Sequence, residues 1–374
     1  MPGSVVPGAV RMRALAADLP NGLLTGFRLG RELPIANASD PPRIYAAGMG
    51  GSAIAIDLLR GLVEAETRIT LTIVRSPDLP RGADRSARAL IVSYSGETWE
   101  ALRAYEAAGR AGADRVVITS GRTLAERAEA DGVPVLRVPP GMPSRAAVGL
   151  MVGGVLGLLD PHFPESNESR IARIAERLRS EIGRFARSGG PSEEIAASIG
   201  DRIPYVYAAT GFRALARRWE TQIQENAKRL ATSGELPEAF HNAMVGWAGM
   251  RRVDGARWIA LILQWSEEDA TVRRGTRVFE HTLSRRGVPV VRVPLASEDR
   301  LEALLEGVAL GDQVSLRMAE RSRIDPCPIP EIDLLRSTLG AAARPEPIAN
   351  GPRSVGTPRI PLGPPATRKR TRSR

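Results

Sequence analysis

Short apolar runs alternate with amphipathic segments between residues 43 and 139. Each apolar run is short and mainly aliphatic, and the segments between the runs repeat apolar residues at helical spacing. The predicted strands are 43–48, 68–74, 87–95, 114–121 and 133–139, and the predicted helices are 53–63, 98–111 and 124–130. Strands that alternate with helices form a parallel sheet covered on both faces.

The same order returns in the second half of the chain. The pattern predicts strands at 203–211, 257–265 and 288–294, helices at 213–228 and 301–321, and a further helix between the last two strands. A charged, periodic segment at 165–199 predicts one connecting helix or a pair of helices. We therefore predict an α/β fold with two doubly wound parallel-sheet domains related by duplication. The predicted domains are 1–164, which includes an N-terminal helix, and 200–340.

Composition narrows the class of protein. Of the 374 residues, 43% are hydrophobic and 25% are charged, which is typical of a soluble globular chain. No apolar stretch is long enough to span a membrane, and the N-terminal segment lacks the pattern of a signal peptide. The single cysteine, Cys327, can form neither an intramolecular disulfide nor a multi-cysteine metal site. We therefore expect a cytoplasmic protein without a bound metal.

The net charge of +10 is concentrated at the C-terminus. Residues 341–374 hold eight basic side chains, one acid and seven prolines, so this segment carries +7 and the rest of the chain only +3. We predict a disordered basic tail. The tail could contact RNA, anionic lipid or an acidic partner, or it could serve solubility alone. No nucleic-acid partner is expected for the body of the protein.

Two polar turns follow predicted strands of the first half, at the edge where parallel sheets bind ligands. The turn Gly48–Ser52 is rich in glycine, and the turn Ser93–Thr98 holds three hydroxyls beside a glycine. Such backbone and hydroxyl groups can bind a phosphomonoester. The glycines depart from the G-x-G-x-x-G pattern of dinucleotide sites, and no lysine follows them as in a Walker motif. The alternative is that Ser95 and Thr98 merely cap the following helix.

Longer segments resemble one known family. Segment 219–247, WETQIQENAKRLATSGELPEAFHNAMVGW, is similar to the E-N-A-K and E-x-x-H-N-x-x-V-G-W signatures of the bifunctional phosphoglucose/phosphomannose isomerases. Segment 310–339, LGDQVSLRMAERSRIDPCPIPEIDLLRSTL, resembles their L-G-D and I-D-P segments. The resemblance implies two SIS (sugar isomerase) domains. It also implies a homodimeric enzyme with a shared active site that interconverts glucose 6-phosphate or mannose 6-phosphate with fructose 6-phosphate. The reaction would proceed through a cis-enediol, with no cofactor and no metal.

The resemblance also implies roles for individual residues. Glu225 would be the base that moves a proton between C1 and C2, Arg145 would stabilise the enediolate, and His241 would assist ring opening from across a dimer interface. Arg336 matches a family lysine that takes part in ring opening. The substrate phosphate would be held by Gly51, Ser52, Ser93, Ser95 and Thr98. A positioned base and a cation facing the developing charge are what this chemistry needs. Taken alone, Glu225 could instead pair with a cation one helical turn away, and His241 could be structural.

Two positions depart from the family's pattern. Glu97 stands where the family has an amide, and its charge would repel a bound phosphate if it faced the hydroxyls. Arg336 stands in place of a lysine, and an arginine does not readily exchange a proton. These departures leave open a second function, a SIS-domain sensor or regulator that binds a sugar phosphate without turning it over.

Overall fold

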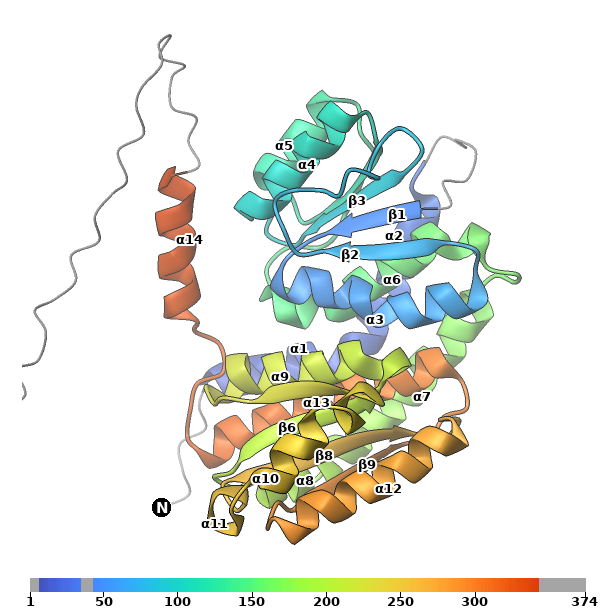
Figure 1. Ribbon diagram of the computed structural model, residues 1–374. Coiled ribbons are helices and arrows are strands. Elements are labelled where there is room, and N and C mark those ends of the chain that lie inside the picture. The colour runs from blue at the N-terminus through green and yellow to red at the C-terminus, as the bar shows by residue number, and fades with distance from the viewer. Residues whose placement is uncertain (1–6, 35–42, 343–374) are drawn as a thin grey trace, which may run out of the picture.

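The computed structural model describes residues 7–34 and 43–342, which form two parallel sheets (Figure 1). The first sheet has the order β2-β1-β3-β4-β5, with β1 (Arg43–Ala47), β2 (Thr70–Val74), β3 (Arg88–Ser93), β4 (Asp114–Thr119) and β5 (Val135–Arg137). The second has the order β7-β6-β8-β9, with β6 (Ile203–Ala209), β7 (Thr232–Leu236), β8 (Trp258–Trp265) and β9 (Val290–Leu295). Both sheets place their second strand at an edge and then follow chain order. The predicted fold class is confirmed, and the common order supports the duplication.

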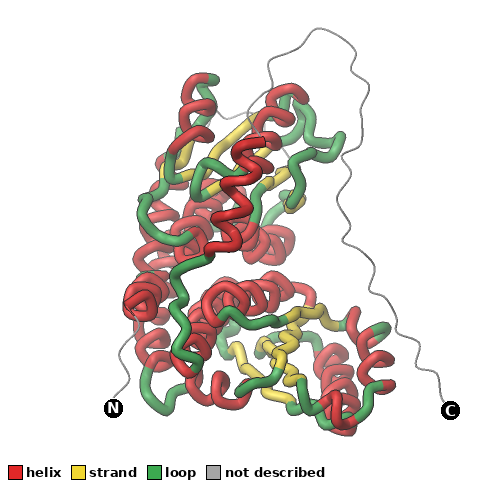
Figure 2. The backbone as a smooth tube through the Cα atoms, turned by 90° about the vertical axis from the view of Figure 1, so that its left-hand side faces the viewer, coloured by secondary structure: helices red, strands yellow, loops and turns green. Residues whose placement is uncertain are grey.

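Helices cover both faces of each sheet (Figure 2). The first sheet lies between α4 (Trp99–Ala111) and α5 (Arg122–Ala130) on one face and α2 (Leu19–Glu32), α3 (Gly50–Glu66) and α6 (Val148–Leu159) on the other. The second lies between α10 (Ala243–Gly249) and α12 (Ala270–Arg285) on one face and α9 (Arg213–Ala227) and α13 (Arg300–Arg321) on the other. The short helices η2 (Asp160–His162) and α11 (Arg252–Gly255) lie in connecting segments.

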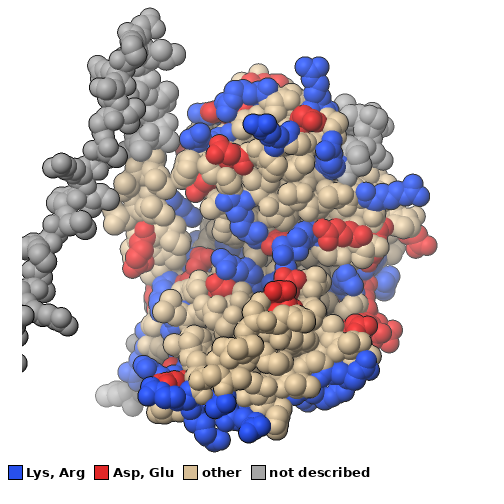
Figure 3. Space-filling view, viewed as in Figure 1, with Lys and Arg blue, Asp and Glu red and all other residues tan. Residues whose placement is uncertain are grey.

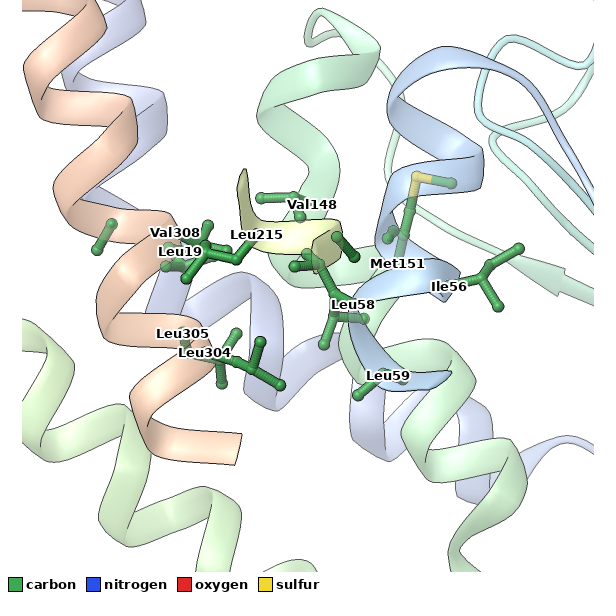
Figure 4. Close-up of a cluster of buried hydrophobic side chains, with 14 of the residues drawn as sticks. Leu19, Ile56, Leu58, Leu59, Val148, Met151, Leu215, Leu304, Leu305 and Val308 are labelled. Atoms are coloured by element: carbon green, nitrogen blue, oxygen red, sulfur yellow. The ribbon is translucent and has the colours of Figure 1, made fainter. Parts of the chain in front are cut away.

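One hydrophobic core joins the two halves. Leu58 and Leu59 of α3 and Met151 of α6 belong to the same buried cluster as Leu215 of α9 and Leu305 of α13 (Figure 4). Each of these five side chains is at most 3% exposed. Because burying apolar surface is the dominant stabilising term, the halves are held together by a continuous core.

Helices α2 and α6 pack backbone to backbone. Their glycines recur every four residues, at 22, 26 and 30 on α2 and at 149, 153 and 157 on α6. A Cβ added at Gly26 would lie 2.1 Å from the carbonyl oxygen of Leu150, and one at Gly153 would lie 2.2 Å from that of Leu23. The glycines are therefore required by the close approach of the two helices.

The segments outside the two sheets bridge the halves. The connection predicted at 165–199 is a pair of helices, α7 (Glu168–Ala186) and α8 (Pro191–Ile199), and both pack on α13. The N-terminal helix α1 (Pro7–Ala17), predicted to belong with 1–164, also packs on α13, and Arg13 pairs there with Glu320. In the described part of the chain, no helix combines the length and apolarity that crossing a membrane requires.

The C-terminal helix α14 (Pro330–Ala342) is drawn beside the first half in Figure 1. Leu334 and Leu335 on it are 69% and 55% exposed. Most of the predicted basic tail, residues 343–374, lies outside the described residues. On the face seen in Figure 3, basic and acidic side chains both occur over each half of the body, in line with its small net charge.

Candidate active site

The hydroxyl turn Ser93–Thr98 lies where β3 ends and α4 begins. Ser93 is buried, and its Oγ accepts a hydrogen bond from the backbone N–H of Gly96 (3.2 Å) and donates one to Thr98 Oγ1 (3.1 Å). Thr98 is the N-cap of α4, yet its side chain makes no capping hydrogen bond with the helix. Ser95 Oγ lies 3.4 Å from Thr98 Oγ1. The three hydroxyls therefore cluster with one another, and none of them serves as the side-chain cap of α4.

The glycine turn lies beside the hydroxyl turn. Helix α3 begins at Gly50, and Ser52 in its first turn accepts a hydrogen bond from the backbone N–H of Tyr94 (3.1 Å), which belongs to the hydroxyl turn. A Cβ added at Gly51 would lie 3.1 Å from the Ser144 carbonyl and 3.2 Å from the Arg145 Cα. All five residues predicted to hold phosphate thus lie in two linked turns at the same sheet edge. The N-termini of α3 and α4 open there, a setting that favours anions.

Glu97 is directed to a different element. Its Oε1 accepts a hydrogen bond from the backbone N–H of Thr123, in the first turn of α5, at 3.0 Å. The side chain is exposed. Helix α5 begins with its positive dipole end at this carboxylate, which is a favourable position for a negative charge. The Glu97 carboxylate is therefore bonded to α5, and the structure gives it no hydrogen bond to the side-chain hydroxyls of Ser93, Ser95 and Thr98.

Arg145 and Glu225 meet between the two halves of the molecule. Arg145 lies on η1 (Ser144–Ala147), and its side chain is 2% exposed; Glu225 lies in the last turn of α9 and is 23% exposed. Arg145 Nη1 is 3.4 Å from Glu225 Oε2. The other two nitrogens of the Arg145 guanidinium also make hydrogen bonds. Nε donates to Asn226 Oδ1 (2.9 Å), and Nη2 donates to the carbonyl of Pro326 (2.6 Å). The guanidinium is therefore fixed on three sides.

Polar side chains of α9 and α13 form hydrogen bonds that support Arg145 and Glu225. Arg218 on α9 donates to the backbone carbonyl of Arg145 (3.0 Å) and to Asp312 Oδ2 on α13 (2.7 Å). Gln222 donates to the other oxygen of Asp312 (2.9 Å), and Asn226 donates to Ser315 Oγ (2.9 Å). Buried polar groups are tolerated when their hydrogen bonds are made. The packing of α9 against α13 therefore sets the position of Arg145.

Burial changes the charge balance of the pair. Desolvation lowers the pKa of Arg145, and the Glu225 carboxylate opposes this by raising it. An arginine stays protonated under such shifts because its ordinary pKa is far above neutrality. The site thus holds a permanent cation, largely removed from water, beside a half-buried carboxylate.

Two of the predicted catalytic residues lie elsewhere. His241 follows η4 (Glu238–Phe240), which continues from the carboxyl end of β7, and its side chain is exposed. Glu225 lies near the amino-terminal ends of the strands of that sheet, whereas His241 lies near their carboxyl ends, because α9 runs back to where β7 begins. Arg336 is exposed on α14 and pairs with Asp333 at 3.3 Å. Within one chain, neither His241 nor Arg336 contacts Arg145 or Glu225.

Sequence reasoning assigned no role to Asn226, Arg218 or Asp312. Asn226 and Asp312 stand inside the E-N-A-K and L-G-D segments, so the signal was present in the motifs. Arg218 carries no such mark. Within residues 7–34 and 43–342, no three His, Cys, Asp or Glu side chains gather as metal ligands.

Comparison with known proteins adds an independent line of support. Residues 189–339 match the model of the bacterial phospho-glucose isomerase C-terminal SIS domain. A bifunctional phosphoglucose/phosphomannose isomerase from Caldicellulosiruptor bescii is 29% identical over 86% of this chain and 97% of its own length. One from Aquifex aeolicus is 30% identical over 79% and 90%. A relative from Sulfolobus acidocaldarius, 26% identical over 80% and 91%, is named a D-glucosamine-6-phosphate 4-epimerase.

Solved structures share the fold. A hypothetical protein from Thermus thermophilus superposes with a TM-score of 0.68 at 14% identity, over 90% of this chain and 94% of its own. A putative phosphosugar isomerase from Silicibacter pomeroyi gives 0.63 at 16% identity, over 84% and 99%.

Proposed function

The chain belongs to the bifunctional phosphoglucose/phosphomannose isomerase family, and from this premise we propose that it interconverts glucose 6-phosphate or mannose 6-phosphate with fructose 6-phosphate. The observation that carries the proposal is the Arg145 guanidinium held 3.4 Å from the Glu225 carboxylate, beside two linked anion-binding turns. The site offers a base, a cation and a phosphate cradle, which are the three parts that this reaction requires.

The phosphate end of the substrate fits the two turns. Ser93, Ser95 and Thr98 supply hydroxyls, and Gly51 supplies a backbone N–H in the first turn of α3. Ser52 follows Gly51, with its own backbone N–H bonded to the Met49 carbonyl. A phosphomonoester accepts several such bonds without a metal. Gly51 touches the backbone of Arg145, so a sugar bound there by its phosphate would extend towards the guanidinium and Glu225.

The reacting end of the substrate fits the pair. Glu225 takes the proton from C2 of the open-chain aldose and returns it to C1, which passes through a cis-enediol. The electron density that moves to the carbonyl oxygen is stabilised by Arg145, whose position is already fixed by Asn226 and Pro326. Preorganised charge of this kind acts without reorganisation during the reaction. No further cofactor enters this scheme.

The complete site requires a second copy of the chain. His241 and Glu225 lie at opposite edges of the second sheet, so one chain cannot bring both to one sugar. We therefore propose a homodimer in which His241 of the partner subunit completes each site and assists ring opening. We also place the enzyme in the cytoplasm, because its lone cysteine, Cys327, offers no disulfide framework.

A coupled assay tests the proposal. Purified protein is supplied with each of the three sugar phosphates, and Glu225→Gln is compared with Glu176→Gln, a change at an 80% exposed carboxylate on α7. We expect turnover by the parent and by Glu176→Gln, and a loss of about 10²- to 10⁴-fold in kcat for Glu225→Gln. A parent that fructose 6-phosphate stabilises against heat but that shows no turnover would instead be a sugar-phosphate sensor.

A further inference from the structure

Lys228 occupies an unusual backbone conformation at the end of α9. Its φ and ψ are 54° and 37°, in the left-handed region, and it directly follows the last helical residue. Helices commonly end on such a residue, but the position usually holds glycine or asparagine, because a Cβ is strained there. A lysine in this position costs free energy, and strained residues of this kind cluster at functional sites.

The ammonium of Lys228 is turned back onto the candidate active site. Nζ donates to the backbone carbonyl of Glu225 (2.5 Å) and to that of Pro326 (3.3 Å). The Pro326 carbonyl also accepts from Arg145. An ammonium has three donors, so one N–H remains after these two bonds. The side chain is exposed, whereas Arg145 is buried, so Lys228 lies on the open side of the cluster.

The chemistry of the ring requires a proton donor at this place. In a closed sugar the ring oxygen is bonded directly to the carbon that becomes the carbonyl. That carbon must lie against the Glu225 carboxylate, so the acid that protonates the ring oxygen must lie within a few bond lengths of it. Two described cations contact Glu225: Arg145 bonds its carboxylate, and Lys228 bonds its backbone carbonyl. Arg145 cannot readily give up a proton, whereas Lys228 can. Arg336, which matches the family lysine, is exposed on α14 and is an arginine, so it does not readily give up a proton either.

We propose that Lys228 is a catalytic residue for ring opening, and that its ammonium donates the proton to the ring oxygen of the substrate. The bond between that oxygen and the anomeric carbon breaks, and its electron pair goes to the oxygen, which takes the proton from Nζ. The anomeric hydroxyl loses its proton to water as the carbonyl double bond forms. The neutral amine then regains a proton from water. This inference rests on the proposed isomerase activity and adds a residue to it.

The electrostatic surroundings suit a group that must give up a proton. Partial desolvation of the ammonium and the Arg145 guanidinium lower the pKa of Lys228, while Glu225, Glu331 at the start of α14 and Asp325 in the preceding loop raise it. The net shift is downward. A lysine with a lowered pKa is a better acid near neutral pH than an ordinary one.

Two variants separate the ammonium from its backbone role. Lys228→Gly removes the ammonium and suits the left-handed conformation, so it preserves the end of α9. Lys228→Arg keeps a charge and long side chain but does not exchange protons. The matched control is Arg323→Gly, because Arg323 is also an exposed cation in the left-handed region (φ 55°), after α13.

Each variant is assayed with fructose 6-phosphate and with 5-deoxyfructose 6-phosphate, an analogue that lacks the ring-closing hydroxyl and stays open. We expect Lys228→Gly and Lys228→Arg to lose about 100-fold in kcat/KM on the cyclic substrate and less than about threefold on the open one. Arg323→Gly should change neither value. The decline of kcat/KM at alkaline pH, which reports loss of the ammonium proton, should be displaced upward or absent in Lys228→Arg.

The results that would overturn the inference are distinct from failure of the proposed function. Equal losses on both substrates, or full activity of Lys228→Arg on the ring form, would show that Lys228 only supports the end of α9. A wild-type protein that turns over neither substrate would refute the isomerase itself.

Discussion

A mixture of two inactive variants tests whether the active site is shared. Glu225 is twelve residues after the start of α9 at Arg213, so at 1.5 Å per residue it lies about 18 Å from the sheet edge where α9 begins. His241 follows the carboxyl end of β7 at that starting edge. No pair of side chains bridges that separation. In a homodimer with a two-fold axis, each site would therefore take Glu225 from one subunit and His241 from the other.

The expected recovery follows from counting sites. In the proposed homodimer, the Glu225→Gln and His241→Ala variants each lack one essential group at both sites. When equal amounts are mixed as unfolded chains and refolded, half of the dimers are mixed, and each mixed dimer has one intact site of two, giving about a quarter of wild-type activity. The coupled assay measures this recovery, and two affinity tags isolate the mixed dimer. Isolated mixed dimers no more active than the parent variants would refute the shared site.

Three further predictions concern affinity and stability. Glu97→Gln keeps an acceptor for the Thr123 N–H and should leave KM for fructose 6-phosphate unchanged, whereas Glu97→Ala loosens the turn and should raise KM about two- to tenfold in initial-rate assays. Gly153→Ala places a Cβ 2.2 Å from the Leu23 carbonyl, and denaturant unfolding should show a loss of about 1–3 kcal/mol or more. Burial and neighbouring Glu302 raise the pKa of Glu306 to about 7. The folded state then holds this proton where the unfolded state has lost it, so the free energy of unfolding should fall between about pH 4.5 and pH 7, and Glu306→Gln should abolish that fall.

The first sheet was predictable because its strands are apolar runs. β3 is buried at all six positions, and its sequence RALIVS reads as a continuous strand. β7 escaped prediction for the opposite reason. Its sequence TSGEL has one large apolar residue, Leu236, and it forms an edge strand that pairs only with β6 among the described strands. Pairing with a neighbour, which local sequence does not record, makes it a strand.

The helix contact between α2 and α6 corresponds to a pattern in the sequence. Glycines four residues apart on both segments leave one face of each helix without side chains. The apolar run 148–159 is too short to span a membrane, and it contains Gly149, Gly153 and Gly157. In the fold they allow backbone contact, as the close approaches at Gly26 and Gly153 show. A four-residue glycine period in two helical segments therefore predicts that they pack together.

The candidate site was only partly predictable. The hydroxyl and glycine turns are local, and the topology of a parallel sheet brings them to one edge. The contact between Arg145 and Glu225 joins residues far apart in the chain, and only the family resemblance named both in advance. Arg218 and Asp312, which support them, are paired through the packing of α9 on α13. Such tertiary pairing produces no periodic pattern in the amino-acid sequence of either helix.

The arrangement of Arg145 and Glu225 accounts for how a buried site could carry a transient negative charge. At rest the guanidinium is balanced by the carboxylate 3.4 Å away. In the proposed reaction, Glu225 becomes neutral when it takes the substrate proton, and the same unit of charge appears on the enediolate oxygen. The charge has moved between two partners of one fixed cation, so the sum within the site is unchanged. Charge separation in a low-dielectric site is costly, and this exchange avoids it.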